Sequence, residues 1–76
     1  MSEYRYTVLY EPVPEGGFNV TVPALPEICT FGENLDEARA IALDAIRCVL
    51  ESMRKDNESI PSDVEPSHEK LAVTLP

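Results

Sequence analysis

The fold is decided by residues 15–46, which read EGGFNVTVPALPEICTFGENLDEARAIALDAI. After the two glycines, apolar and polar residues alternate over residues 18–22, and this pattern indicates a β-strand with one buried face. Pro23 and Pro26 end that strand because neither residue can donate a backbone hydrogen bond. The short apolar segment 28–32 predicts another strand, and a helical pattern begins directly after it.

The helix is expected over residues 33–55. Asn34 suits the N-cap, and Glu37 follows three residues later, as in a capping box. An apolar stripe at helical spacing predicts the face that packs on a sheet. It comprises Leu35, Ala38, Ala42, Ala45, Ile46, Val49 and Met53. Leu43 and Leu50 lie at intermediate angles, so they line either the edge of the core or a subunit contact.

Two more strands are expected outside this stretch. Residues 4–11 alternate, with three tyrosines on one face, and form a β-hairpin with residues 18–22. Residues 69–75 alternate again and are expected to form a fourth strand after a connector without periodicity. The order β-β-β-α-β predicts an α+β fold of two layers, in which one helix packs on one face of an antiparallel sheet. We expect residues 1–76 to form a single domain.

The sheet is expected to leave one face and two edges uncovered. Polar residues dominate the uncovered face, and its apolar exceptions are expected to be Leu9, Ala72 and either Phe31 or Cys29. Unpaired edges invite pairing with another chain. A chain of 76 residues buries only about 60% of its unfolded surface, so association would add needed burial. We therefore expect a homodimer or a higher homo-oligomer.

The charge balance restricts the partners. Fourteen acidic residues and six basic residues give a formal net charge of −8. Phosphate backbones attract Lys and Arg, so no direct binding of nucleic acid is expected. The charge suits a basic protein partner. The alternative that the charge only keeps a small domain in solution stays open.

Residues for catalysis, metals or cofactors do not form any recognisable pattern. His68 lies in a charged connector, and Cys29 and Cys48 lack the spacing of a zinc site. Both cysteines are expected to be reduced and buried as small apolar residues. Gly16 and Gly17 do not belong to a phosphate-binding loop, so no cofactor is expected. The chain shows neither a signal peptide nor a long apolar run, and a cytoplasmic location without membrane contact is expected.

Four short motifs in the opening stretch resemble the HicB-like antitoxin family. They are Gly16-Gly17-Phe18, Pro23-Ala24-Leu25-Pro26, Thr30-Phe31-Gly32 and Leu35-Asp36-Glu37-Ala38. Their order and spacing carry the resemblance, which covers most of the chain, although Glu27 stands where family members commonly have glycine. The resemblance implies a partial RNase H-like fold without the acidic residues of the nuclease, and hence no enzyme activity.

The resemblance also implies a partner, a small basic HicA-like toxin that cleaves messenger RNA and is neutralised by binding. Many such antitoxins carry a further DNA-binding domain; since this chain stops after the predicted fourth strand, direct operator binding is not expected. For toxin contact we expect acids near loops and edges, namely Glu11, Glu15, Glu27 and Glu33. Two alternatives stay open: an interaction domain with no toxin, and a nuclease that uses surface carboxylates and a metal.

Overall fold

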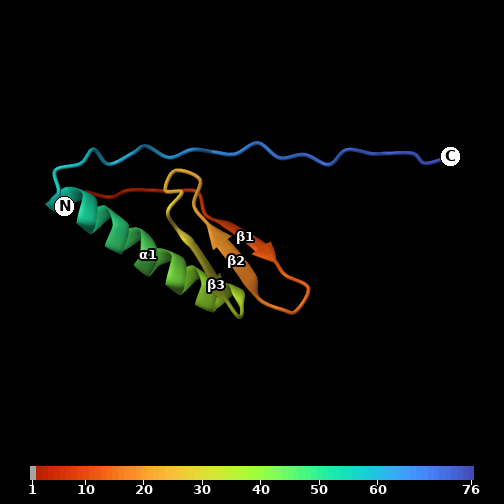
Figure 1. The fold of residues 1–76 in the computed structure, drawn as a ribbon, viewed down its shortest axis with the longest axis horizontal. Helices are drawn as coiled ribbons and strands as arrows, with labels where there is room; N and C mark the ends of the chain where they lie inside the picture. Colours follow the sequence, from red (N-terminus) through yellow and green to blue (C-terminus); the bar gives the residue numbers. More distant parts are fainter. Residues whose placement is uncertain (1) are drawn as a thin grey trace.

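A computed structural model describes residues 2–76 and contains three strands followed by one helix. The strands are β1 (Leu9–Pro12), β2 (Phe18–Thr21) and β3 (Cys29–Gly32), and the helix is α1 (Leu35–Lys55). The strands pair antiparallel in the order β1-β2-β3, and α1 packs against β2 and β3 (Figure 1). The predicted α+β class is therefore confirmed. The relation to an RNase H-like fold stays a prediction.

The strand register assigns each residue to one face of the sheet. Val20 pairs with Tyr10 on one side and with Thr30 on the other, and this row faces α1 because Val20 is fully buried. The two neighbouring rows point away from the helix. They are Leu9–Thr21–Cys29 and Glu11–Asn19–Phe31. The uncovered face is thus polar, with Leu9, Cys29 and Phe31 as its apolar exceptions. Ala72, which is also expected there from the sequence, lies instead in the exposed segment that pairs with no strand.

The connection between β2 and β3 supplies much of the core. Val22, Leu25 and Ile28 are buried, and half-buried side chains of α1 pack against them. Two backbone hydrogen bonds hold the connection in consecutive turns, from the Leu25 amide to the Val22 carbonyl and from the Ile28 amide to the Leu25 carbonyl. A second cluster joins Val20 to Ala38 and Ala42. The proline-rich segment that ends β2 is therefore a core element as well as a strand terminator.

The start of α1 has the predicted cap. The Glu37 amide donates to Asn34 Oδ1 over 2.8 Å, so Asn34 is the N-cap. The Glu37 carboxylate accepts from the Glu33 amide, one residue earlier than in a capping box. The predicted stripe packs on the sheet except for Leu35, which is 45% exposed. Leu35 lies in the first turn of the helix, before the point where Ala38 meets Gly32 of β3.

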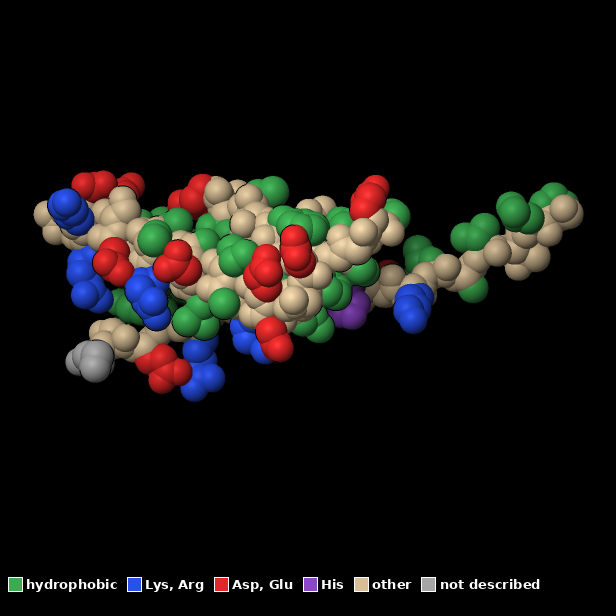
Figure 2. All heavy atoms as spheres, turned by 90° about the horizontal axis from the view of Figure 1, so that it is seen from below, with side chains coloured by type: hydrophobic (Ala, Val, Ile, Leu, Met, Phe, Trp, Pro, Cys, Tyr) green, Lys and Arg blue, Asp and Glu red, His purple; other side chains and the backbone are tan. Residues whose placement is uncertain are grey.

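The predicted fourth strand is wrong. Residues 69–75 are exposed and extended, and they pair with no strand (Figure 1). They project from the body of the molecule with apolar side chains along them (Figure 2). The connector before them runs beside the N-terminal segment, where the Tyr6 hydroxyl donates to the Pro61 carbonyl over 2.6 Å. This contact leads the chain past the sheet instead of into it.

Two further expectations need correction. The first strand begins at Leu9 instead of residue 4, because Leu9 pairs with Thr21 and the partner chain turns away at Pro23. Cys29 and Cys48 are exposed free cysteines, not buried ones. Cys29 lies on the uncovered sheet face. Within residues 2–76, no helix is both long enough and apolar enough to cross a bilayer.

Candidate functional site

Two of the predicted partner-binding acids meet in one hollow of the surface. Glu15, in the β1–β2 connection, and Glu33, directly after β3, line a depression of about 410 Å³. Gly16, Gly17 and Phe31 complete its lining, and we call it the Phe31 hollow. The arrangement places two carboxylates beside an aromatic ring that is 43% exposed. Aromatic residues are enriched at protein interfaces, and the rims of such interfaces are polar.

The shape of the hollow depends on Gly17. Its φ is +90°, a conformation that side chains with a Cβ rarely adopt. A Cβ at this position would also collide with the ring of Phe31. The turn is closed by hydrogen bonds from the Val13 amide to the Gly17 carbonyl (3.1 Å) and from the Gly16 amide to the Val13 carbonyl (3.0 Å). The absence of a side chain at Gly17 therefore lets the Phe31 ring lie close against the β1–β2 turn.

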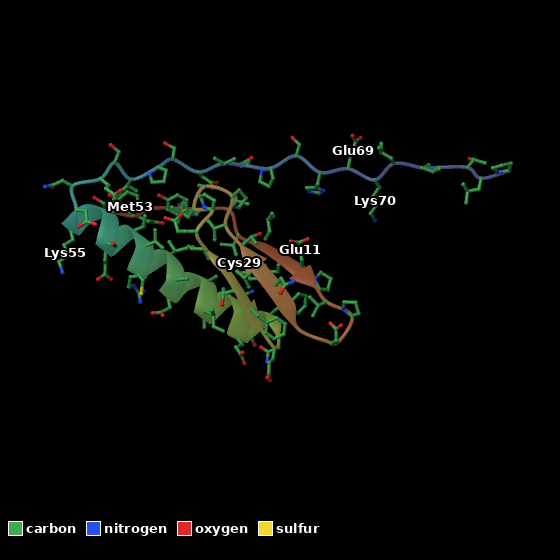
Figure 3. All side chains as sticks on the ribbon, viewed as in Figure 1. Glu11, Cys29, Met53, Lys55, Glu69 and Lys70 are labelled. Atoms are coloured by element: carbon green, nitrogen blue, oxygen red, sulfur yellow. The ribbon has the colours of Figure 1, made fainter. Side chains whose placement is uncertain are left out.

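Glu11 reaches the same surface through the strand register. Glu11 of β1 pairs with Asn19 of β2, and Asn19 pairs with Phe31 of β3. Glu11 is thus about 10 Å from Phe31 across two strand spacings on the uncovered face, and Figure 3 shows it on β1. Glu27 is exposed in the turn between β2 and β3, at the opposite end of the sheet. The structure brings together Glu15 and Glu33, places Glu11 on the adjoining sheet face outside the hollow, and leaves Glu27 apart.

Sequence reasoning treated Phe31 only as an apolar exception and missed its place in the hollow. A signal was present, since Phe31 has the outward parity of its strand and is aromatic. Exposed aromatic residues on a sheet face are enriched at protein interfaces. The contact with Gly17 had no local signal because the two residues are separated by 14 positions in the chain.

The titratable groups with shifted pKa values hold the connector to the N-terminal segment. The pKa of Asp63 is lowered, first because the Thr7 amide donates to its carboxylate and then because the Thr7 hydroxyl does, each over 2.8 Å. The pKa of Tyr6 is raised, chiefly by burial and also by the nearby Tyr4 and Asp63. In the described chain no three His, Cys, Asp or Glu side chains gather as a metal site requires.

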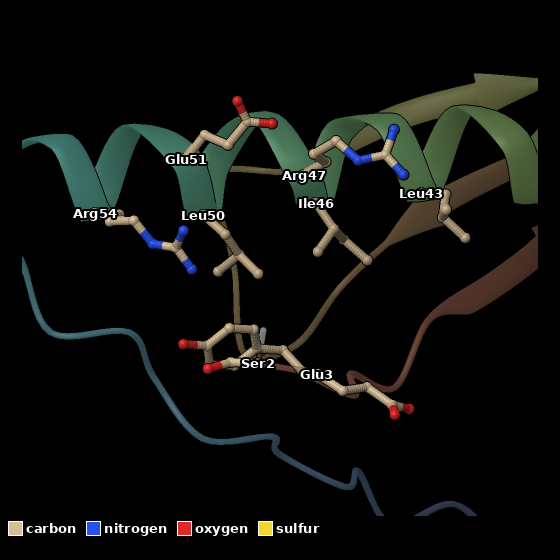
Figure 4. Close-up of a pocket in the computed structure, with 9 residues that line it drawn as sticks. Ser2, Glu3, Leu43, Ile46, Arg47, Leu50, Glu51 and Arg54 are labelled. Atoms are coloured by element: carbon tan, nitrogen blue, oxygen red, sulfur yellow. The ribbon is translucent and has the colours of Figure 1, made fainter.

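A second concave surface runs between α1 and the N-terminal segment. It consists of a groove of about 370 Å³ and an adjoining one of about 220 Å³, which share Tyr4, Leu43 and Ile46. We call this surface the α1 groove. Leu43, Ile46 and Leu50 point from α1 toward the segment that holds Ser2 and Glu3 (Figure 4). Leu43 is 55% exposed, so it lies in the groove instead of the core.

The fold and the Phe31 hollow together define a small α+β module in which two carboxylates flank an exposed aromatic ring. The family model described as the HicB-like antitoxin of bacterial toxin–antitoxin systems matches residues 6–75. The chain belongs to this family. The resemblance drawn from the four short motifs is therefore confirmed.

Three relatives illustrate the similarity. Antitoxin HicB 1 of Photorhabdus laumondii is 47% identical over 57 residues, which cover 75% of this chain and 37% of that protein. Antitoxin HicB of Escherichia coli K12 is 42% identical over 57 residues, covering 75% and 41%. The UPF0150 protein Ta0767 of Thermoplasma acidophilum is 42% identical over 59 residues, covering 78% and 86%. The chain thus spans about two fifths of the length of the two antitoxins that it matches.

Proposed function

We propose that this chain neutralises a small basic HicA-like toxin by direct protein contact, with no catalysis of its own. The observation that carries the proposal is the Phe31 hollow, where Glu15 and Glu33 flank an exposed aromatic ring. Membership of an antitoxin family supports it. The net charge of −8 favours a basic protein over nucleic acid as the partner. Because the proposed toxin cleaves messenger RNA, we place the encounter in the cytoplasm.

Two kinds of side chain at the hollow contribute to binding in different ways. An exposed aromatic ring loses water on both faces when a partner covers it, and such rings often dominate interface energies. Carboxylates at the rim attract basic side chains and align the partner, although each exposed pair contributes little by itself. Phe31 therefore sets how long the complex lasts, while Glu11, Glu15 and Glu33 set which partner approaches.

The test is binding of the purified chain to a small basic HicA-like protein, taken from the adjacent reading frame where one is encoded there, measured by isothermal titration calorimetry. Phe31→Ala and the double variant Glu15→Lys/Glu33→Lys should each weaken the complex at least about tenfold, or about 1.4 kcal/mol. The matched control is Asp44→Lys/Glu58→Lys, which makes the same change in net charge at exposed positions outside the hollow. The control should stay within about threefold of the unaltered chain.

Two results would count against the proposal. Equal weakening by both double variants would mean that only the total charge matters and that the Phe31 hollow is not the contact. If no complex formed at micromolar concentrations, the proposed neutralisation of a toxin by direct contact would be wrong. Glu27→Lys is a separate variant, and a loss of affinity there would extend the contact to the other end of the sheet.

The second candidate function is an interaction domain with no toxin. It is favoured by the match to the UPF0150 protein Ta0767, of which this chain covers 86% and whose name mentions no antitoxin. A binding partner without ribonuclease activity, captured through the same hollow, would support this function. Growth rescue of cells that express the neighbouring toxin would support the first function instead.

A further inference from the structure

The core of the molecule is incomplete along β1. Because α1 packs mainly against β2 and β3, it covers the inward side chains of β1 and of the segment before it only in part, and they remain half-exposed. Tyr6, Val8 and Tyr10 therefore line one wall of the α1 groove, and Leu43 and Ile46 line the other. A groove with apolar walls between a strand edge and a helix has the shape that one more strand would fill.

The chain carries a segment of the right pattern that is attached to nothing. Leu71, Val73 and Leu75 alternate along residues 69–75 and are 76%, 80% and 83% exposed. The radius of gyration is 15.4 Å, whereas a compact chain of this length has about 11 Å. The excess comes from this projecting tail, which Figure 1 shows leaving the body toward the C-terminus. Exposing three aliphatic side chains on the same face of an extended segment to water is unfavourable.

The tail does not reach the groove of its own protomer. Pro61 lies beside Tyr6 and Asp63 lies beside Thr7, so the connector runs in the same direction as the N-terminal segment. Continued at the same offset of 56 positions, this alignment brings His68 level with Pro12. The sheet edge ends at Pro12. The tail therefore passes the end of β1 before its apolar residues begin.

We propose that the tail of one protomer adds as a strand to the outer edge of β1 in a second copy, and that the exchange is reciprocal. The Val13 amide points toward β2, since it donates to the Gly17 carbonyl. Residues an even number of positions away along β1 face β2 as well, so Val8 and Tyr10 are the residues that offer their backbone groups at the open edge. Leu71, Val73 and Leu75 of the second copy then enter the α1 groove.

The charges of the groove favour this occupant over a basic toxin. Arg39, Arg47 and Arg54 line it, which is half of the six basic residues of the chain. Glu51 and Glu3 also line it, and Glu3 pairs with Arg5 over 2.9 Å. The segment that leads into the tail contains Glu65 and Glu69, which complement arginines. Since Phe31 lies on the uncovered sheet face and the groove lies beside α1, strand exchange leaves the Phe31 hollow free. The inference is therefore independent of toxin binding.

The first test compares two substitutions on opposite faces of the tail. Val73→Asp places a charge on the apolar face, and Thr74→Asp places the same charge on the other face. Sedimentation equilibrium of the full chain from 1 to about 200 µM should show a dimer for the unaltered chain and for Thr74→Asp. Val73→Asp should raise the dimer dissociation constant at least about tenfold, with unchanged far-ultraviolet circular dichroism. Equal dissociation constants for the two variants would overturn the exchange.

The second test establishes that the contact is between copies. In a background of Cys29→Ser and Cys48→Ser, a chain with Leu43→Cys is mixed with a chain with Val73→Cys and oxidised. Strand exchange predicts a mixed disulfide dimer in high yield, whereas Thr74→Cys in place of Val73→Cys should give little. A monomer at 200 µM whose tail is protected from trypsin at Lys70 would show that the tail fills its own groove. A monomer that binds the toxin less tightly with Val73→Asp would make the toxin the occupant, and either result would overturn the exchange.

Discussion

Gly17 is a single residue on which both the β1–β2 turn and the Phe31 hollow depend. Gly17→Ala should destabilise the fold by roughly 1–3 kcal/mol, because it combines a strained positive φ with a collision against the Phe31 ring. Gly16→Ala is the matched control, since its φ is +101° but nothing lies within 4 Å of a Cβ there. Urea unfolding should give a larger loss for Gly17→Ala than for Gly16→Ala. Equal losses would mean that the ring moves aside at no cost.

Asp63 makes the path of the connector sensitive to acid. Hydrogen bonds from the Thr7 amide and hydroxyl lower its folded-state pKa below the usual value of 3.8. A lowered carboxyl pKa stabilises the folded contact above pH 3.8, and that stabilisation is lost as the pH falls through the folded-state pKa.

Nuclear magnetic resonance of the Thr7 amide during an acid titration measures this change. The amide shift should follow a titration with a midpoint below 3.8, and the step should be absent in Asp63→Asn. A midpoint at or above 3.8 would show that the contact does not form in solution.

At the scale of the secondary-structure element, the stability of α1 depends on its N-cap. Asn34→Ala removes the acceptor of the Glu37 amide and should cost about 1 kcal/mol. For a domain of this size such a loss lowers the melting temperature by roughly 4–8 °C. Asn34→Asp retains an acceptor and should melt within about 2 °C of the unaltered chain. A melt of Asn34→Ala that matches the unaltered chain would mean that the first turn frays without consequence.

Elements whose partners are local in the sequence could be predicted, and those fixed by distant contacts could not. Alternation and helical spacing predicted β2, β3 and α1 to within two residues at either end. Residues 69–75 have an equally good strand pattern, but a pattern does not supply an edge to pair with. The contact between Thr7 and Asp63, 56 positions apart, decides where that segment lies. No periodicity within the tail contains that information.

The same distinction applies to the candidate site: its parts that follow from local pattern could be predicted, and its parts that depend on distant contacts could not. Parity along the strands was sufficient to place Glu11 and Phe31 on the uncovered face. The convergence of Glu15 and Glu33 requires the β1–β2 turn to lie beside the end of β3, which follows from the register of three strands. The acids were chosen for their charge and their position near loops. Glu27 satisfied both criteria and still lies at the wrong end of the sheet to join the hollow.

At the scale of the whole molecule, the charge is unevenly distributed between two surfaces. The chain has a net charge of −8, yet three of its six basic residues line the α1 groove. The Phe31 hollow has acids on its rim and no basic residue in its lining. Glu3 and Glu51 offset part of the positive charge of the groove, so a basic partner is attracted more strongly to the Phe31 hollow than to the groove. This separation gives the two proposed associations different responses to salt.

Association with a basic toxin should be slowed strongly by salt. Raising the ionic strength from 10 mM to 0.15 M shortens the Debye length from about 30 Å to about 8 Å. The attraction that guides the encounter is then screened, and the association rate should fall at least about tenfold while the dissociation rate changes little. Surface plasmon resonance measures both rates. If salt changed mainly the dissociation rate of the toxin complex, the charged contacts would lie inside the buried interface instead of on its rim.

The Phe31→Ala variant should affect the other rate. It should dissociate faster and keep its association rate, because the ring acts after the encounter.

Formation of the dimer should respond less to salt than formation of the toxin complex. The dimer depends on aliphatic side chains, so its dissociation constant should vary less with ionic strength.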